Sequence, residues 1–173
     1  IREATLAEVN EWYEDLRPTE TQTPIRDLSI TEIKPLDEVT FEMSSSFGAK
    51  CSNLATMRTF GFPEGTIPNG FGIPFYFYDQ FMQYNNFYEE AQVIIDNPAF
   101  QNDINFRNER LEDFRRSIKD APMPQWMLDE LQAMQEAFPL ETPIRVRSST
   151  NNEDLPGFSG AGLYTSKTQY PCL

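Results

Sequence analysis

Cysteines, long apolar runs and basic side chains are scarce in this sequence. Its two cysteines, Cys51 and Cys172, lie far apart and match no metal-binding spacing, which favours a reduced, cytoplasmic protein without a structural metal. No apolar run approaches the ~20 residues of a membrane span, and the N-terminus has no signal-peptide pattern. Because 27 acids outnumber 14 bases, nucleic acid and anionic membranes are poor partners. The first residue is Ile1 rather than Met, so we expect a piece of a longer polypeptide.

Aromatic residues are abundant, and 14 Phe, 7 Tyr and 2 Trp can build the core of one domain of 173 residues. Apolar periodicity predicts an amphipathic helix over 5–16, with Thr5 and Glu8 at capping-box spacing, and then a polar linker. The order of the later segments predicts an α+β fold. Short strands are expected at 25–33, 39–43, 71–77 and 144–147, a loop at 44–48, and helices at 49–60, 78–96, 106–119 and 124–138.

The helical patterns also predict which side chains face the core. The expected inward residues include Leu54 and Met57 in the first of these helices. In the later helices they include Tyr84, Ile95, Leu111 and Leu128, and Glu112 is expected to pair with Arg116 on the solvent side.

The segment 144–164 contains the most informative pattern. An alternating strand places Arg145 and Arg147 on one face and runs into the hydroxyls of Ser148 and Ser149. An acidic pair and a Gly-rich loop follow. Guanidinium groups, hydroxyl donors and free backbone N–H groups suit a polyphosphate. The residues alone leave a second interpretation open, a strand edge followed by an ordinary surface loop.

Lys50 is expected where a loop meets the start of a helix. The positive end of a helix and its N–H groups favour an anion, and the ammonium adds a point charge. A solvated surface lysine is the alternative, because one Lys near a Gly is a weak signal.

Three segments together resemble the nucleotide-binding domain of phosphoenolpyruvate synthases and pyruvate phosphate dikinases. The first is Arg-Ser-Ser at 147–149 with Glu-Asp-Leu-Pro at 153–156 and Ser-Gly-Ala-Gly at 159–162. The second, Gly48-Ala49-Lys50-Cys51-Ser52-Asn53-Leu54, resembles that family's Gly-Gly-Lys-Gly-Ala-Asn-Leu. The third, Ile67-Pro68-Asn69-Gly70-Phe71, resembles its Val-Pro-Asp-Gly-Phe turn. The resemblance covers roughly residues 30–168 and identifies the chain as similar to this family.

The resemblance implies roles for particular residues. Lys50 and Arg147 would contact the phosphates of ATP, and the loop 155–164 would close over the triphosphate. Glu153 and Asp154 would orient Arg147, support Mg²⁺ indirectly or cap the turn, and these alternatives stay open. No residue of this chain is expected to be catalytic or to bind a metal directly. The expected phosphate-binding set is Lys50, Arg145, Arg147, Ser148, Ser149, Ser159, Gly160, Ala161 and Gly162.

The same resemblance implies an N-terminal ATP-grasp subdomain over 25–173, with the helix and linker of 1–24 outside it. The second subdomain, a phosphohistidine domain and an acceptor domain would lie elsewhere in the parent protein, with pyruvate as the default acceptor. Because the chain has no histidine, it cannot carry the phosphohistidine, and we expect it to be inactive by itself. It departs from the family at Arg145, Cys51, Gly160 and Leu163, which leaves the lid conformation and the nucleotide preference open.

Two other classes of function compete with the dikinase. One is a non-catalytic module with a degenerate ATP-grasp fold that senses nucleotide or binds a protein. The other is a helical interaction domain in which the Arg-Ser-Ser segment is accidental, so that Lys50→Ala and Arg147→Ala would leave any nucleotide affinity unchanged.

Overall fold

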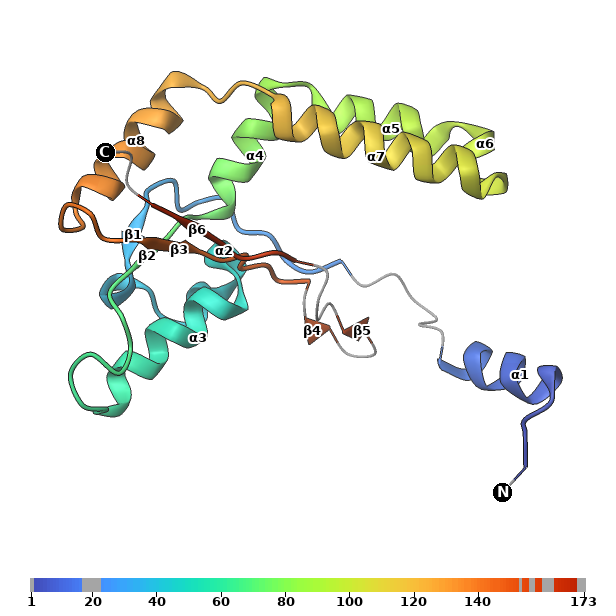
Figure 1. The fold of residues 1–173 in the computed structure, drawn as a ribbon, viewed down its shortest axis with the longest axis horizontal. Coiled ribbons are helices and arrows are strands. Elements are labelled where there is room, and N and C mark those ends of the chain that lie inside the picture. The colour runs from blue at the N-terminus through green and yellow to red at the C-terminus, as the bar shows by residue number, and fades with distance from the viewer. Residues whose placement is uncertain (1, 17–22, 153, 156–157, 160–163, 171–173) are drawn as a thin grey trace.

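A computed structural model describes residues 2–16, 23–152, 154–155, 158–159 and 164–170 (Figure 1). Helices dominate these residues and the strands are short, which is compatible with the α+β class. In this part of the chain the α-helices are α1 (Leu6–Leu16), α2 (Ser44–Phe47), α3 (Ala49–Met57), α4 (Phe75–Tyr84), α5 (Phe87–Asp96), α6 (Pro98–Asn102), α7 (Ile104–Asp120) and α8 (Gln125–Glu136), and the 3₁₀ helices are η1 (Leu36–Glu38), η2 (Phe41–Met43) and η3 (Arg58–Phe60).

The strands of the described residues form separate antiparallel pairs rather than one continuous sheet. The strand expected over 144–147 is confirmed as β3, and its Arg145 lies opposite Thr168. The strand expected over 71–77 is limited to its first two residues, because Pro74 starts α4. The pairs are β1 (Lys34–Pro35) with β2 (Phe71–Gly72), β3 (Ile144–Val146) with β6 (Lys167–Gln169), and β4 (Asp154–Leu155) with β5 (Phe158–Ser159).

The core beneath the candidate site is built around Phe47, whose exposed fraction is 1%. Phe47 ends α2 and packs in one cluster with Leu36, Val39 and Ala55. The helix expected over 49–60 is confirmed as α3 continued by η3, and Gly61 ends it in the left-handed conformation at φ 71°. This small apolar cluster therefore holds the start of α3 in place.

Strands expected over 25–33 and 39–43 are wrong. Residues 25–33 contain no strand, and the Ser29 N–H donates to Asp27 Oδ1 at 2.9 Å, a local turn that competes with strand pairing. Residues 41–43 form η2, and the loop expected over 44–48 contains α2. Apolar alternation did not reveal the turn at Asp27 or the short helices over 41–47.

The single helix expected over 78–96 is two helices, α4 and α5. The chain breaks at Asn86, which takes the left-handed conformation at φ 57°. The Asn85 side chain donates to the carbonyl oxygens of Phe81 at 3.0 Å and Pro122 at 3.2 Å, which stabilises the break. Tyr84 and Ile95, expected to face inward, are exposed because the stripe does not continue through the break.

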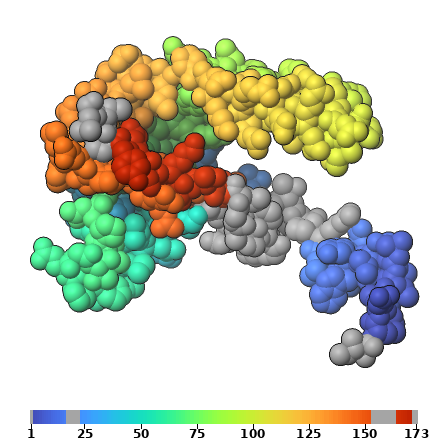
Figure 2. All heavy atoms as spheres, viewed as in Figure 1, coloured from blue at the N-terminus to red at the C-terminus, as the bar shows by residue number. Residues whose placement is uncertain are grey.

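Helices α5, α6 and α7 project from the rest of the chain as an arm (Figure 2). Leu111 of α7 is 46% exposed, contrary to expectation, because an arm this thin offers its helices few partners. Arg116 pairs with Asp113 at 3.4 Å rather than with Glu112. The arm is therefore a largely polar hairpin with a narrow apolar seam.

Two further inward assignments, in α3 and α8, are wrong. Met57 is 38% exposed, and Ala55 takes its place in the core. In α8, Leu128 is 43% exposed while its neighbour Met127 is 3% exposed. Pro124 is the N-cap of α8 rather than its first helical residue. Periodicity found these helices but assigned the wrong positions to the core.

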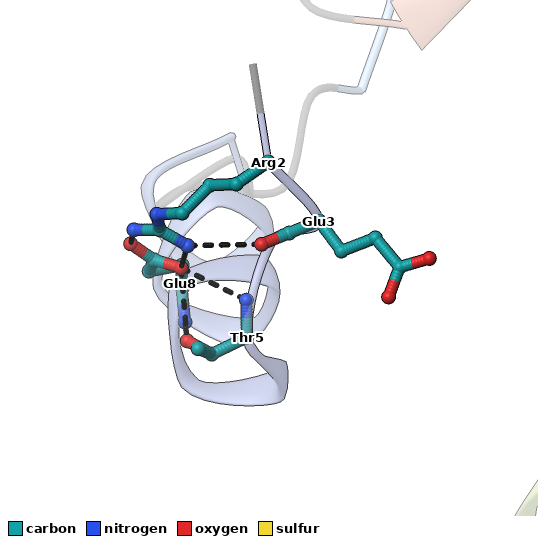
Figure 3. A network of polar contacts seen from close by, with 4 residues as sticks. All are labelled: Arg2, Glu3, Thr5 and Glu8. Atoms are coloured by element: carbon teal, nitrogen blue, oxygen red, sulfur yellow. Dashed lines mark hydrogen bonds and ion pairs between the residues drawn. The ribbon is translucent and has the colours of Figure 1, made fainter.

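Helix α1 confirms the predicted capping box and lies apart from the rest of the chain (Figures 1 and 3). The Thr5 N–H donates to Glu8 Oε2 at 2.8 Å, and the Glu8 N–H donates back to the Thr5 hydroxyl at 3.3 Å. Arg2 pairs with the same carboxylate and donates to the Glu3 carbonyl at 2.9 Å. No side chain of α1 is buried. Every helix in the described residues is too short or too polar to reach across a bilayer.

We predict that Arg2→Ala will raise the pKa of Glu8. The Arg2 guanidinium, together with the Thr5 donors, lowers the pKa of this carboxyl to about 2 from 4.5. A carboxylate with a lowered pKa stabilises the cap above its ordinary pKa, and that contribution disappears as the pH falls towards about 2. NMR titration of the Glu8 side chain should show this pKa move upward in Arg2→Ala. An unchanged titration would contradict the pairing.

Candidate functional site

The two charged segments singled out in the sequence meet in space at Ser149. Its hydroxyl donates to the Phe47 carbonyl oxygen at 2.7 Å and accepts from the Cys51 N–H at 2.9 Å. These partners are 102 and 98 residues away in the sequence. We call the contact between 47–51 and 149–150 the Gly48 junction, because that glycine lies at its centre.

The Gly48 junction caps the N-terminus of α3 from outside the helix. In addition to the Cys51 bond, the Ala49 N–H donates to the Thr150 carbonyl oxygen at 3.2 Å. A helix leaves its first N–H groups without partners inside the helix, and here two of them bond to the Ser149–Thr150 segment. An anion at this helix end would therefore compete with protein acceptors for those two donors, and side chains would have to supply most of its contacts.

Gly48 is required at the junction by its backbone angles and by its surroundings. Its φ of 82° and ψ of 160° lie in a region that is essentially restricted to glycine. A Cβ atom on this residue would lie 2.6 Å from the Ser149 hydroxyl oxygen and closer still to the Ser149 backbone carbonyl. The glycine therefore permits the close approach of the two segments.

Lys50 and Arg147 lie on either side of the junction, and both are exposed. Lys50 is in the first turn of α3, and Arg147 follows β3 directly, two residues before Ser149. Within the described residues the Arg147 side chain forms no hydrogen bond or ion pair. The hydrogen bonds of the junction thus connect the segment that carries Lys50 to the segment that carries Arg147.

Arg145 has a protein partner, since its guanidinium donates to the Thr168 hydroxyl at 2.8 Å. The bond crosses the β3–β6 pair, in which these two residues lie opposite each other. Val146, which alternates with the two arginines along the strand, is 49% exposed. Arg145 therefore helps to join β3, which precedes the Gly-rich loop, to β6, which follows it.

The Gly-rich loop is described only in part. The backbone of Asp154 pairs with that of Ser159 in the β4–β5 ladder. The predicted site residues Glu153, Gly160, Ala161 and Gly162 lie outside the described residues. Ser148, also expected in the site, is half-buried next to the junction.

Cys51, one of the departures from the family pattern, has a side chain that points into the body. A Cβ atom on Gly72 would lie 2.7 Å from the Cys51 sulfur and 2.8 Å from the Phe47 ring, so the thiol packs against β2. Burial raises the pKa of this thiol to about 11. The cysteine therefore fills space between the start of α3 and β2.

A hollow of about 350 Å³ lies elsewhere, on the connector between η3 and β2, and contains none of the predicted site residues. Its Arg58 is engaged by Asp37 at 2.6 Å, by the carbonyls of Ile67 and Pro68 and by the Asn69 side chain. Among the described residues, no group of three His, Cys, Asp or Glu side chains could hold a metal ion.

Three residues of the junction or next to it were not in the predicted site: Gly48, Thr150 and Asn151. Gly48 opens one of the motifs, and its position before a helix was the available signal. Thr150 contributes a backbone carbonyl, which no side-chain pattern can reveal. Asn151 donates to the Ile25 carbonyl at 2.6 Å, across 126 residues, and nothing local indicates that contact.

Comparison with known proteins identifies one family. Residues 44–169 match the AMP/ATP-binding domain of pyruvate phosphate dikinase. Both segments of the Gly48 junction lie inside the matched region. No curated protein and no solved structure matches the chain.

Gly48→Ala should destabilise the fold more than Gly61→Ala, which serves as the matched control. Both glycines have positive φ, but Gly61 has no atom within 4 Å of its missing Cβ. The left-handed conformation of Gly61 costs a non-glycine residue about 1–2 kcal/mol. Gly48 has a conformation essentially restricted to glycine, and overpacking there adds about 1–3 kcal/mol. Urea denaturation measures both free energies of unfolding. Equal losses of unfolding free energy in the two variants would show that a Cβ atom at residue 48 does not clash with Ser149.

Native Cys51 should resist alkylation. With a pKa of about 11, the thiol is almost entirely protonated at pH 8, and only the thiolate reacts quickly. Iodoacetamide labelling followed by peptide mapping should show slow modification of Cys51 in buffer and fast modification in urea. Equal rates in the two conditions would mean that the thiol is exposed.

Proposed function

Because the chain belongs to the pyruvate phosphate dikinase AMP/ATP-binding domain family, we propose that it holds ATP for a phosphotransferase of which it forms part. Residues 25–173 would be the N-terminal subdomain of an ATP-grasp domain, and residues 1–24 an extension that precedes it. The observation that supports this proposal is the Gly48 junction, which brings the Lys50 and Arg147 segments together across about a hundred residues.

Charge supports the same proposal. The chain has a formal net charge of −13, which repels a polyphosphate at long range. Binding then depends on a local concentration of cations, and Lys50 and Arg147 lie on two segments joined by hydrogen bonds. A nucleotide phosphate between them would receive a point charge from Lys50 and paired N–H donors from Arg147.

The remaining site residues have different proposed roles. Ser148 would donate to a phosphate oxygen, and Arg145 would act from the β3–β6 pair. Ser149 uses its proton and a lone pair within the protein, so we assign it to holding the junction rather than to the phosphates. Ser159, Gly160, Ala161 and Gly162 would form the lid, with Glu153 and Asp154 at its base.

Mg²⁺ receives no ligand from this chain in the proposal. An ion that accompanies ATP would be held by the phosphates and by groups elsewhere in the parent protein. The same holds for the phosphoryl carrier: since the chain has no histidine, a phosphohistidine and the acceptor site, pyruvate by default, would belong to other domains. The chain itself binds and orients the polyphosphate.

We expect Lys50→Ala and Arg147→Ala each to weaken ATP binding by the full-length parent about tenfold or more, because a charge-assisted hydrogen bond contributes about 1.5–3 kcal/mol. Isothermal titration calorimetry measures the affinity. Arg115→Ala, which removes an exposed arginine of α7, is the matched control and should leave the affinity unchanged. Equal affinities in all variants would favour a helical interaction domain with an accidental motif.

Phosphorus NMR of the parent with Mg-ATP and pyruvate tests the reaction. Formation of AMP, phosphate and phosphoenolpyruvate, abolished by Arg147→Ala, is the expected result for a dikinase. ATP conversion to AMP without phosphoenolpyruvate would point to another acceptor. ATP binding without turnover would replace the dikinase by a nucleotide-sensing module.

A further inference from the structure

Three consecutive residues that precede the matched region, Ile25, Arg26 and Asp27, each contact a different element. Together we call them the strap. Ile25 contacts the segment after Ser149, Arg26 contacts α4 and α5, and Asp27 contacts α2. Consecutive residues in an ordinary linker have no reason to be bonded to three separate parts of a domain.

The first contact of the strap is with the segment that carries Arg147. The Asn151 side chain donates to the Ile25 carbonyl oxygen at 2.6 Å, two residues beyond the Ser149 hydroxyl that closes the Gly48 junction. This bond holds the end of the Arg-Ser-Ser segment where the Gly-rich loop begins.

The second contact is with the segment that leads to Lys50. The Asp27 carboxylate accepts from the hydroxyl of Ser46 at 2.7 Å, and the Asp27 N–H donates to the Ser45 carbonyl at 2.9 Å. Ser46 is fully buried and directly precedes Phe47 and Gly48. The donors of Ser29 and Ser46 lower the pKa of Asp27, so this acceptor stays ionised at neutral pH.

The third contact fixes the strap to the base of the arm. Arg26 pairs with Asp79 at 3.2 Å, donates to the Tyr88 hydroxyl at 2.8 Å and lies 5.7 Å from the centre of the Tyr88 ring. The Asp79 side chain is 5% exposed and also accepts from Tyr88 and Gln83. A buried carboxylate requires a cation, and Arg26 supplies it from outside the matched region.

We propose that the strap is a positioning device for the nucleotide site, with Asp27 and Asn151 as the positioning residues. This inference rests on the proposed function. The strap bonds to Ser45, Ser46 and Asn151, which adjoin the two segments of the Gly48 junction in the sequence, and to α4 and α5. It therefore limits the movement of Lys50 and Arg147 relative to each other before ATP arrives. Protein side chains that are held in place beforehand lose less conformational entropy when ATP binds. The strap would therefore increase the affinity without contacting the nucleotide.

The test compares Asp27→Ala and Asn151→Ala with Asp37→Ala in the full-length parent. Asp37 is a matched control, because its carboxylate is also held by protein donors but through Arg58 of η3. Loss of preorganisation at about 0.5–1.5 kcal/mol per ordered side chain corresponds to a two- to tenfold weaker ATP affinity in Asp27→Ala and Asn151→Ala. Asp37→Ala should bind ATP like the unaltered protein.

Measuring adenosine affinity as well as ATP affinity distinguishes a loss of positioning from a general disruption of the fold. It has no phosphates, so its affinity should be the same in all three variants if the strap acts only on Lys50 and Arg147. Equal losses of ATP and adenosine affinity, or no loss of ATP affinity, would overturn the inference. If the unaltered parent does not bind ATP, or if Lys50→Ala and Arg147→Ala have no effect, the proposed function itself fails.

Hydrogen exchange provides a readout that needs no ligand. The Ala49 and Cys51 amides bond to Thr150 and Ser149, so they report directly on the junction. They should exchange faster in Asp27→Ala and Asn151→Ala than in Asp37→Ala. Unchanged exchange at these two amides would show that the strap does not hold the junction.

Discussion

The hydroxyl of Ser149 is the contact on which the candidate site depends. It donates to the Phe47 carbonyl and accepts from the Cys51 N–H, so one side chain satisfies a carbonyl at the end of α2 and a free donor at the start of α3. The bonds are possible only because Gly48 has no side chain. Through them, the segment that follows β3 and the start of α3, about a hundred residues apart in the sequence, become parts of one surface.

This arrangement has a consequence for how the site would bind an anion. A free helix N-terminus offers backbone donors, but here two of them are engaged by Ser149 and Thr150. In the proposed function, affinity for a polyphosphate therefore comes from Lys50, in the first turn of the capped helix, and from Arg147, and both side chains are exposed. In a strongly acidic protein, the relative position of these two cations matters more than their number.

Local patterns predicted helices well and side-chain directions less well. Capping at Thr5 and termination at Gly61 involve neighbours in sequence, and both predictions are confirmed. Leu111 and Leu128 were expected to be buried because they lie on apolar stripes, yet the arm and α8 bury only part of those stripes. The break at Asn86 depends on a hydrogen bond from Asn85 to Pro122, a partner that no window of local sequence contains.

The sequence by itself determined the family, through motifs at 48–54 and 147–162, and the residue types of the site. Those properties reside in the order of the side chains and need no coordinates. The tertiary structure alone decided which groups are already used: Ser149 in the cap, Arg145 with Thr168, and Cys51 against Gly72. It also decided that residues 25–27, without a motif of their own, contact three elements of the domain. The physical reason is that hydrogen bonds between residues a hundred positions apart depend on chain geometry, which a linear pattern does not contain.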